Sequence, residues 1–193
     1  MIAADTGHIA VHEAGAIENT GHKVFTLKSK NGKIDAGGIK RFCENFYADV
    51  NHEHRLSPGM VYISQPTEYG TLYSKKELEE INKVCKEYEL LLFADGARLA
   101  YALGSSECDT SLKSIAGFCD VFYIGGTKCG ALLGEAIVFT NRDICKHFFT
   151  NMKLFGGVLA KSRVMGIQFD VLFSDGLYER LGKTGVDAAM KIK

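Results

Sequence analysis

The stretch LLLFADG, residues 90–96, indicates a buried β-strand that ends in an acid. Its first five residues are apolar without interruption, which is typical of a strand in a parallel sheet with both faces covered. Two further segments are predicted strands: GMVYISQP, residues 59–66, which Pro66 closes, and DVFYIGG, residues 120–126. These three segments predict the centre of a mainly parallel sheet.

Segments between these strands have the periodicity of amphipathic helices. Residues 75–88 place apolar side chains on one face. Ser74, with Glu77 three residues later, predicts a capping box at the start of this helix. Residues 36–49 and 110–118 are also predicted helices. This alternation predicts an α/β fold, with a mainly parallel sheet flanked by helices and right-handed crossovers.

The pattern extends toward both ends of the chain. Residues 22–29 and 135–141 are predicted strands, and the first residues form a short apolar run that leads into a helix. From about Arg142 the chain is predicted to be helical, with a break near residues 155–157.

Composition excludes several classes of protein. Lys plus Arg and Asp plus Glu each total 23, and this neutral balance argues against a nucleic-acid partner. The chain has no apolar run of about eighteen residues, which argues against a membrane-spanning helix. It also has no basic start of a signal peptide. Six cysteines without a C-x-x-C pair predict free thiols and a cytoplasmic protein.

Two charged residues follow predicted strands at the edge where parallel sheets bind ligands. Asp95 directly follows the apolar run of LLLFADG, and Lys128 comes two residues after DVFYIGG. Ligands bind beyond the carboxyl ends of such strands, so both residues are expected to face one crevice if the strands are near neighbours. Lys128 does not belong to a Walker-type phosphate loop, because Thr127 precedes it and Cys129 follows it.

Each candidate residue has an ordinary interpretation beside a chemical one. Lys128 is either a structural lysine that reaches water or a desolvated amine of lowered pKa that bonds to a carbonyl carbon as a Schiff base. Asp95 is either a helix N-cap or turn carboxylate, or the partner of the protonated ring nitrogen of pyridoxal phosphate. Arg98 either makes a surface ion pair or binds a phenolate or carboxylate oxygen.

His8 lies near the start, in HIAVHEAGA. Its imidazole either stacks on a pyridine ring or is an ordinary satisfied histidine. His8 and His12 are spaced for one helical face, but the second histidine of H-E-x-x-H is missing. No metal site is therefore predicted.

Four segments, taken together and in order, resemble the low-specificity threonine aldolases within the β-eliminating lyases. They are HIAVHEAGA, YISQPTEYGTLYS, FADGAR and YIGGTKCGALLGEAIVFTNRD. The resemblance covers nearly the whole chain. It implies an incomplete large domain of a fold type I enzyme, pyridoxal 5′-phosphate as cofactor, an amino acid as small-molecule substrate, and a homodimer or homotetramer.

The resemblance also gives the candidate residues roles. It implies that Lys128 is the Schiff-base lysine and that His8 stacks on the cofactor ring, which makes both catalytic. Asp95 is implied to pair with the ring nitrogen, Arg98 to lie near the ring hydroxyl or the substrate carboxylate, and Thr127 to lie near the cofactor phosphate. The implied reaction breaks the Cα–Cβ bond of threonine, giving glycine and acetaldehyde. The alternative reaction is β-elimination from another amino acid.

Two departures from the family pattern stand out. Where the family carries a histidine after the strand, this chain has Glu68, which is either a contact to the substrate hydroxyl or part of a surface turn. The chain also resembles a fragment, because the family's N-terminal phosphate-binding loop and its C-terminal domain have no counterpart. We expect residues 1–155 to be part of the large domain and residues 156–193 to be a helical connection toward a small C-terminal domain that is mostly absent. We also expect negligible activity of this chain alone, the alternative being a non-catalytic remnant.

Overall fold

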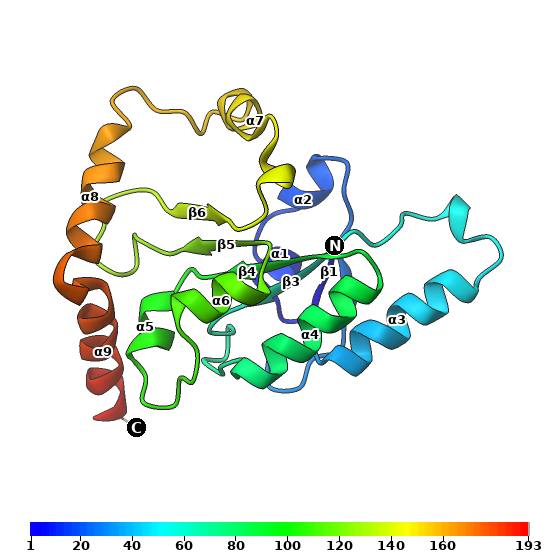
Figure 1. Ribbon diagram of the computed structural model, residues 1–193, viewed down its shortest axis with the longest axis horizontal. Helices are drawn as coiled ribbons and strands as arrows, with labels where there is room; N and C mark the ends of the chain where they lie inside the picture. Colours follow the sequence, from blue (N-terminus) through cyan, green and yellow to red (C-terminus); the bar gives the residue numbers. More distant parts are fainter. Residues whose placement is uncertain (193) are drawn as a thin grey trace.

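The computed structural model describes residues 1–192, and its centre is a six-stranded sheet with the strand order β2-β1-β3-β4-β5-β6 (Figure 1). The five strands from β2 to β5 in this order pair in parallel, and β6 is antiparallel to β5. The mainly parallel sheet predicted from the sequence is therefore confirmed. The strands are β1 (Ile2–Ala4), β2 (Phe25–Leu27), β3 (Met60–Ser64), β4 (Leu91–Asp95), β5 (Val121–Ile124) and β6 (Ala136–Phe139).

The reversal at β6 follows from the connection before it. Residues 125–135 contain turns and no helix. A parallel pairing needs a crossover of a dozen or more residues, which usually includes a helix. The short connection instead returns the chain beside β5, with Ile124 paired to Ala136.

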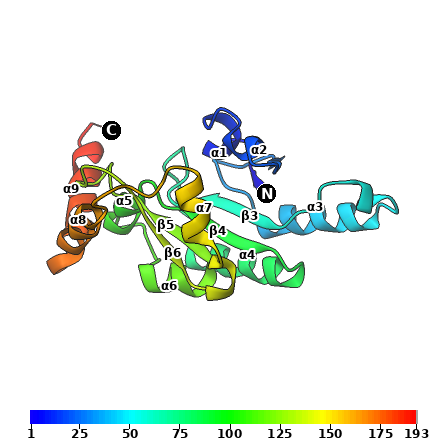
Figure 2. The same cartoon turned by 90° about the horizontal axis from the view of Figure 1, so that it is seen from above.

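Three helices cover one face of the sheet: α3 (Ala36–Ala48), α4 (Lys75–Glu87) and α6 (Leu112–Phe118). Figure 2 shows them together on one side. The predicted capping box of α4 is present, with the Glu77 N–H donating to Ser74 Oγ at 3.2 Å and the Ser74 N–H donating to Glu77 Oε2 at 2.8 Å. The main core lies between these helices and the sheet and includes Val61, Ile63, Leu92, Ala94, Phe122, Ile39, Ile81 and Ile115.

The other face carries aromatic side chains from the central strands. The rings of Tyr62 and Phe93 stack with centroids 5.4 Å apart, and Tyr123 lies 6.3 Å from Phe93. The short helices α1 (His8–Val11) and α2 (Ala16–Asn19) lie on this side of the sheet (Figure 2).

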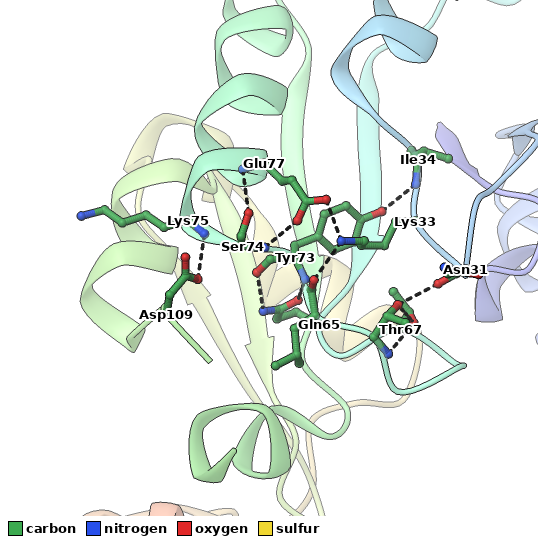
Figure 3. A network of polar contacts seen from close by, with 12 residues as sticks. Asn31, Lys33, Ile34, Gln65, Thr67, Tyr73, Ser74, Lys75, Glu77 and Asp109 are labelled. Atoms are coloured by element: carbon green, nitrogen blue, oxygen red, sulfur yellow. Dashed lines mark hydrogen bonds and ion pairs between the residues drawn. The ribbon is translucent and has the colours of Figure 1, made fainter. Parts of the chain in front are cut away.

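A buried polar network fixes the loop that follows β3 (Figure 3). Gln65 is 1% exposed, and its side chain both donates to the Tyr73 carbonyl oxygen and accepts from the Tyr73 N–H, at 3.1 and 2.9 Å. The Tyr73 hydroxyl in turn accepts from the Ile34 N–H at 2.9 Å. Lys33 forms an ion pair with Glu77 at 2.6 Å beside this network. Because buried polar groups are costly when unpaired, these bonds hold residues 65–73 in one conformation.

From Arg142 onward the described chain is mainly helical, as predicted, and its α-helices are α7 (Phe148–Leu154), α8 (Arg163–Phe173) and α9 (Leu177–Met190). The break predicted near residues 155–157 is confirmed, because α7 ends there and Gly156 has a φ of +78°. Short 3₁₀ turns lie at His52–His54, Arg142–Cys145 and Ser174–Gly176. The division of the chain at residue 155 stays a prediction.

Helix α5 (Leu99–Gly104) was not predicted, and it packs against α9 (Figure 1). A Cβ atom on Gly182 would lie 1.9 Å from the Ala100 carbonyl oxygen, and one on Gly104 would lie 2.2 Å from the Lys183 nitrogen. The two helices therefore touch through their backbones, which only glycine permits at these positions.

All six cysteines are free thiols, as predicted. Burial raises the pKa of Cys85 and of Cys119 to about 12, so both thiols stay protonated and unreactive at neutral pH. Within residues 1–192, no helix combines the length and the apolar character needed to cross a membrane.

Two Gly→Ala substitutions, one at the contact between α5 and α9 and one away from it, should change the free energy of unfolding in opposite directions. Gly182→Ala should lower the free energy of unfolding by about 1–3 kcal/mol, because the added methyl group overlaps the backbone of α5. Gly166→Ala, in α8, meets no atom within 4 Å and should gain up to about 1 kcal/mol from helix propensity. Urea unfolding of both variants checks this, and equal stabilities would contradict the packing described.

Candidate active site

Lys128 lies on the turn that follows β5, and contacts from several elements hold this turn. The hydroxyl of Tyr178, in α9, donates to the Gly125 carbonyl oxygen at 2.8 Å. The hydroxyl of Tyr101, in α5, donates to the Lys128 carbonyl oxygen. The Gly125 N–H donates to the Gly96 carbonyl oxygen at 2.9 Å, which joins the turn to the loop after β4.

Glycines let the ends of β4 and β5 come together. A Cβ atom on Gly96 would lie 2.0 Å from the Tyr123 carbonyl oxygen, and one on Gly125 would lie 2.3 Å from the Ala97 carbonyl oxygen. Any side chain at either position would force the loops apart. Because β4 and β5 are neighbours, Asp95 and Lys128 lie at one edge of the sheet, as the sequence predicted.

Asp95 is buried at the end of β4, with 7% of its surface exposed. Its Oδ1 accepts from the Ala97 N–H at 2.9 Å, and its Oδ2 accepts from the Tyr62 hydroxyl. Burial and the neighbouring Asp95 carboxylate raise the pKa of the phenol groups of Tyr62 and Tyr123, so both remain donors. Asp95 closes a turn but is not a helix N-cap, because that position of α5 is Arg98.

The predicted residues meet at one cavity of about 110 Å³. His8, Glu68, Asp95, Arg98 and Lys128 all line it, together with Glu13, Ser64, Pro66, Ala97 and Tyr123. It adjoins an open hollow of about 460 Å³ lined by His8, His12, Glu68 and Arg98. The sheet thus gathers side chains from α1 and from the loops after β3, β4 and β5 at one place.

The desolvated surroundings that the chemical interpretation of Lys128 assumed are not found. Lys128 and Thr127 are both exposed, because they project from a turn beyond the end of the sheet. Arg98 is also exposed and makes no ion pair within residues 1–192, so its interpretation as a surface ion pair is not supported.

His8 begins helix α1 and is held at two atoms. Its Nδ1 lies 2.5 Å from Glu13 Oε1, and its backbone N–H donates to Glu68 Oε1 at 2.9 Å. The Ser64 hydroxyl donates to the same Glu68 oxygen at 2.7 Å. Glu68 therefore ties the end of β3 to the start of α1, and a contact to substrate stays a prediction. Sequence reasoning missed Glu13, because a spacing of five residues from His8 is no helical signal.

Thr127 does not line the cavity, and its hydroxyl donates to Glu135 Oε1 at 2.8 Å. The Gly126 N–H donates to the other oxygen of Glu135. No pattern in the sequence predicts this contact. The implied position of Thr127 near a cofactor phosphate stays a prediction.

Two larger cavities of the described chain are lined mainly by apolar surface. A cavity of about 500 Å³ is lined largely by apolar residues, among them Met1, Phe25, Met60 and Leu91, which lie at the amino ends of strands. A groove of about 600 Å³ between α5 and α9 is mainly apolar apart from Arg98. No group of three or more His, Cys, Asp or Glu side chains within residues 1–192 is arranged to hold a metal ion. The smaller cavity is the stronger candidate, because charged side chains converge on it at the ligand-binding edge.

Comparison with known proteins supports the resemblance seen in the sequence. The family model described as Beta-eliminating lyase matches residues 1–189. A low specificity L-threonine aldolase of Pseudomonas sp. (strain NCIMB 10558) is 34% identical over 93% of this chain and 51% of its own length. The corresponding protein of Pseudomonas aeruginosa is 32% identical over the same shares.

Solved structures of known enzymes are also similar to this chain. Threonine aldolase of Leishmania major is 44% identical and superimposes with a TM-score of 0.90 over 95% of this chain and 52% of its own. Cystalysin of Treponema denticola, which contains pyridoxal 5′-phosphate, is 16% identical with a TM-score of 0.68 over 94% of this chain and 46% of its own, and it shows the fold alone. The chain spans about half the length of these relatives.

The contacts of Glu68 predict a structural effect of its removal. Glu68→Ala should lower the free energy of unfolding by about 1–3 kcal/mol, because two donors lose their acceptor. Glu68→Gln keeps a carbonyl acceptor and should stay within about 1 kcal/mol of the wild type. Glu13→Ala removes only an exposed pair and should cost less than about 1 kcal/mol. Urea unfolding of the three variants checks this order, and an unaffected Glu68→Ala would leave Glu68 no structural role.

Proposed function

The chain belongs to the beta-eliminating lyase family, and from this premise we propose that the protein is a pyridoxal-phosphate-dependent lyase that cleaves threonine to glycine and acetaldehyde. The observation that carries the proposal is the convergence of Lys128, Asp95, His8 and Arg98 on one cavity. These residues come from separate segments, and each has the functional group that the chemistry needs.

The side chains fit the cofactor group by group. Lys128 supplies a primary amine that bonds to an aldehyde carbon. Asp95 supplies a carboxylate for a protonated ring nitrogen, and Arg98 a guanidinium for an anionic oxygen. When bound, pyridoxal phosphate supplies a ring that withdraws electrons from the substrate's Cα.

The Asp95 carboxylate has acceptor sites left for a cation. The Ala97 N–H and the Tyr62 hydroxyl each occupy one lone pair, and a carboxylate has about four such acceptor sites. Only 7% of the surface of Asp95 is exposed, so little water reaches it. In such surroundings a negative charge attracts a cation more strongly than it does in water.

His8 and Arg98 are suited to orient ligands. Glu13 engages His8 Nδ1 and thereby fixes the ring, which leaves its Nε2 to a ligand, while the ring of His12 lies 5.2 Å from the His8 ring. Arg98 has no acidic partner within the described residues, so its donors remain free for a carboxylate or phenolate. It lines both the cavity and the adjoining hollow, where a bound amino acid would have room.

The proposal includes assembly and location. A homo-oligomer is supported by apolar side chains that stand exposed on α7 and α8, namely Phe149, Leu154, Val164, Ile167 and Val171. A cytoplasmic location is supported by the free cysteines.

Lys128 should carry the cofactor. Reduction with borohydride in the presence of pyridoxal phosphate should fix the label to the peptide that contains Lys128, because the reduced bond to an amine is stable. Lys128→Ala should lose the label, and the control Lys161→Ala should keep it. Mass spectrometry of the digest checks this, and a label that persists in Lys128→Ala would refute the assignment.

Cleavage of threonine is best tested in a hybrid, because the chain spans about half the length of its relatives. Residues 1–192 would replace the matching half of the Leishmania major enzyme. The hybrid should form glycine and acetaldehyde in equal amounts from threonine, and the same hybrid with Lys128→Ala should form neither. A folded hybrid that binds cofactor but releases 2-oxobutanoate and ammonia from threonine would show β-elimination and contradict the proposed reaction.

A further inference from the structure

Glu135 closes the turn that carries Lys128. It directly precedes β6, and the pairing of Ile124 with Ala136 places it opposite the end of β5. One carboxylate oxygen accepts from the Gly126 N–H, and the other accepts from the Thr127 hydroxyl at 2.8 Å. The Glu135 side chain thus links the start of β6 to the first residues after β5.

Two later residues of this turn also bind Gly126, at its carbonyl oxygen. The N–H groups of Cys129 and Ala131 both donate to the Gly126 carbonyl oxygen, at 2.9 and 3.0 Å. A Cβ atom on Gly126 would lie 2.9 Å from the Gly134 carbonyl oxygen. The N–H of Gly126 is therefore held by Glu135 and its carbonyl oxygen by the turn, two residues before Lys128.

Glu135 also takes the donors that an anion would use. A backbone N–H and a hydroxyl from successive residues after a strand are suited to bind a phosphate. Here both are bonded to a carboxylate, and a second anion at the same donors would meet a like charge at close range. The Thr127 hydroxyl thus cannot serve Glu135 and a phosphate equally well.

We propose that Glu135 is a positioning residue that aims Lys128 at the cavity, and that the Thr127 hydroxyl serves this contact rather than the cofactor phosphate. The proposal rests on the proposed function and deepens it, since it assigns work at the same site. It differs from the role that family resemblance implies for Thr127. Positioning of Lys128 does not depend on the phosphate group of the cofactor, whereas binding of the phosphate does.

The test compares two aldehydes, pyridoxal phosphate and pyridoxal, which lacks the phosphate. The rate of borohydride-trapped labelling of Lys128 is measured by mass spectrometry for the wild type, Thr127→Val, Thr127→Ser and Glu135→Gln, with the exposed Glu107→Gln as control. We expect Thr127→Val and Glu135→Gln to slow labelling by both aldehydes by a similar factor of about ten, the effect of one lost hydrogen bond to a charged group. Thr127→Ser should restore the rate, and Glu107→Gln should leave it unchanged.

A contrary pattern would overturn the inference. If Thr127 binds the phosphate, Thr127→Val slows labelling by pyridoxal phosphate alone, and Glu135→Gln speeds it because a repelling charge is gone. The pair of Thr127→Val and Thr127→Ser decides the matter if Glu135→Gln does not fold. A wild type that labels Lys128 with neither aldehyde would instead refute the proposed function, and this inference with it.

Discussion

The site depends on the close approach of two backbone segments at Gly96 and Gly125. The Gly125 N–H donates to the Gly96 carbonyl oxygen at 2.9 Å, and neither position has room for a Cβ atom. This contact joins the loops after β4 and β5, which carry Asp95 and Lys128. A parallel sheet brings neighbouring strand ends to one edge, and the glycines bring the loops beyond those ends into contact. A larger residue at either glycine would separate the acid from the amine.

Helices α5 and α9 bind the turn that carries Lys128. The Tyr178 hydroxyl, in α9, and the Tyr101 hydroxyl, in α5, bind carbonyl oxygens on either side of Gly126 and Thr127. Both helices are kept in register by backbone contact at Gly182 and Gly104. The C-terminal helix therefore contributes to the site although none of the residues that line the small cavity belongs to it. Glu135 binds Gly126 and Thr127 in the same turn, so contacts from the start of β6 and from α5 and α9 together hold the backbone that carries Lys128.

Local patterns in the sequence predicted five of the six strands and the main helices, whereas β1 was seen only as a short apolar run. The apolar run before Asp95 and the capping box of Ser74 and Glu77 are examples of such patterns. Of the residues that meet at the cavity, Asp95 and Lys128 were located by their places after predicted strands, and Glu68 by the family resemblance. The sequence did not predict α5, which is only six residues long, or the pairing of His8 with Glu13. The Glu135 contact and the exposure of Lys128 also depend on how distant segments pack. Long-range contacts of single polar side chains leave no periodic signal in a sequence.

The central claim is that Asp95 faces the ring nitrogen of a cofactor held by Lys128. Nuclear magnetic resonance of pyridoxal phosphate labelled with ¹⁵N in the ring tests this most directly, because the nitrogen shift reports whether that atom carries a proton. The account predicts a protonated ring nitrogen at neutral pH in the wild type, and loss of that proton in Asp95→Asn, where no negative charge stabilises the cation. A wild-type signal from an unprotonated nitrogen, or an Asp95→Asn signal identical to a protonated wild type, would contradict it.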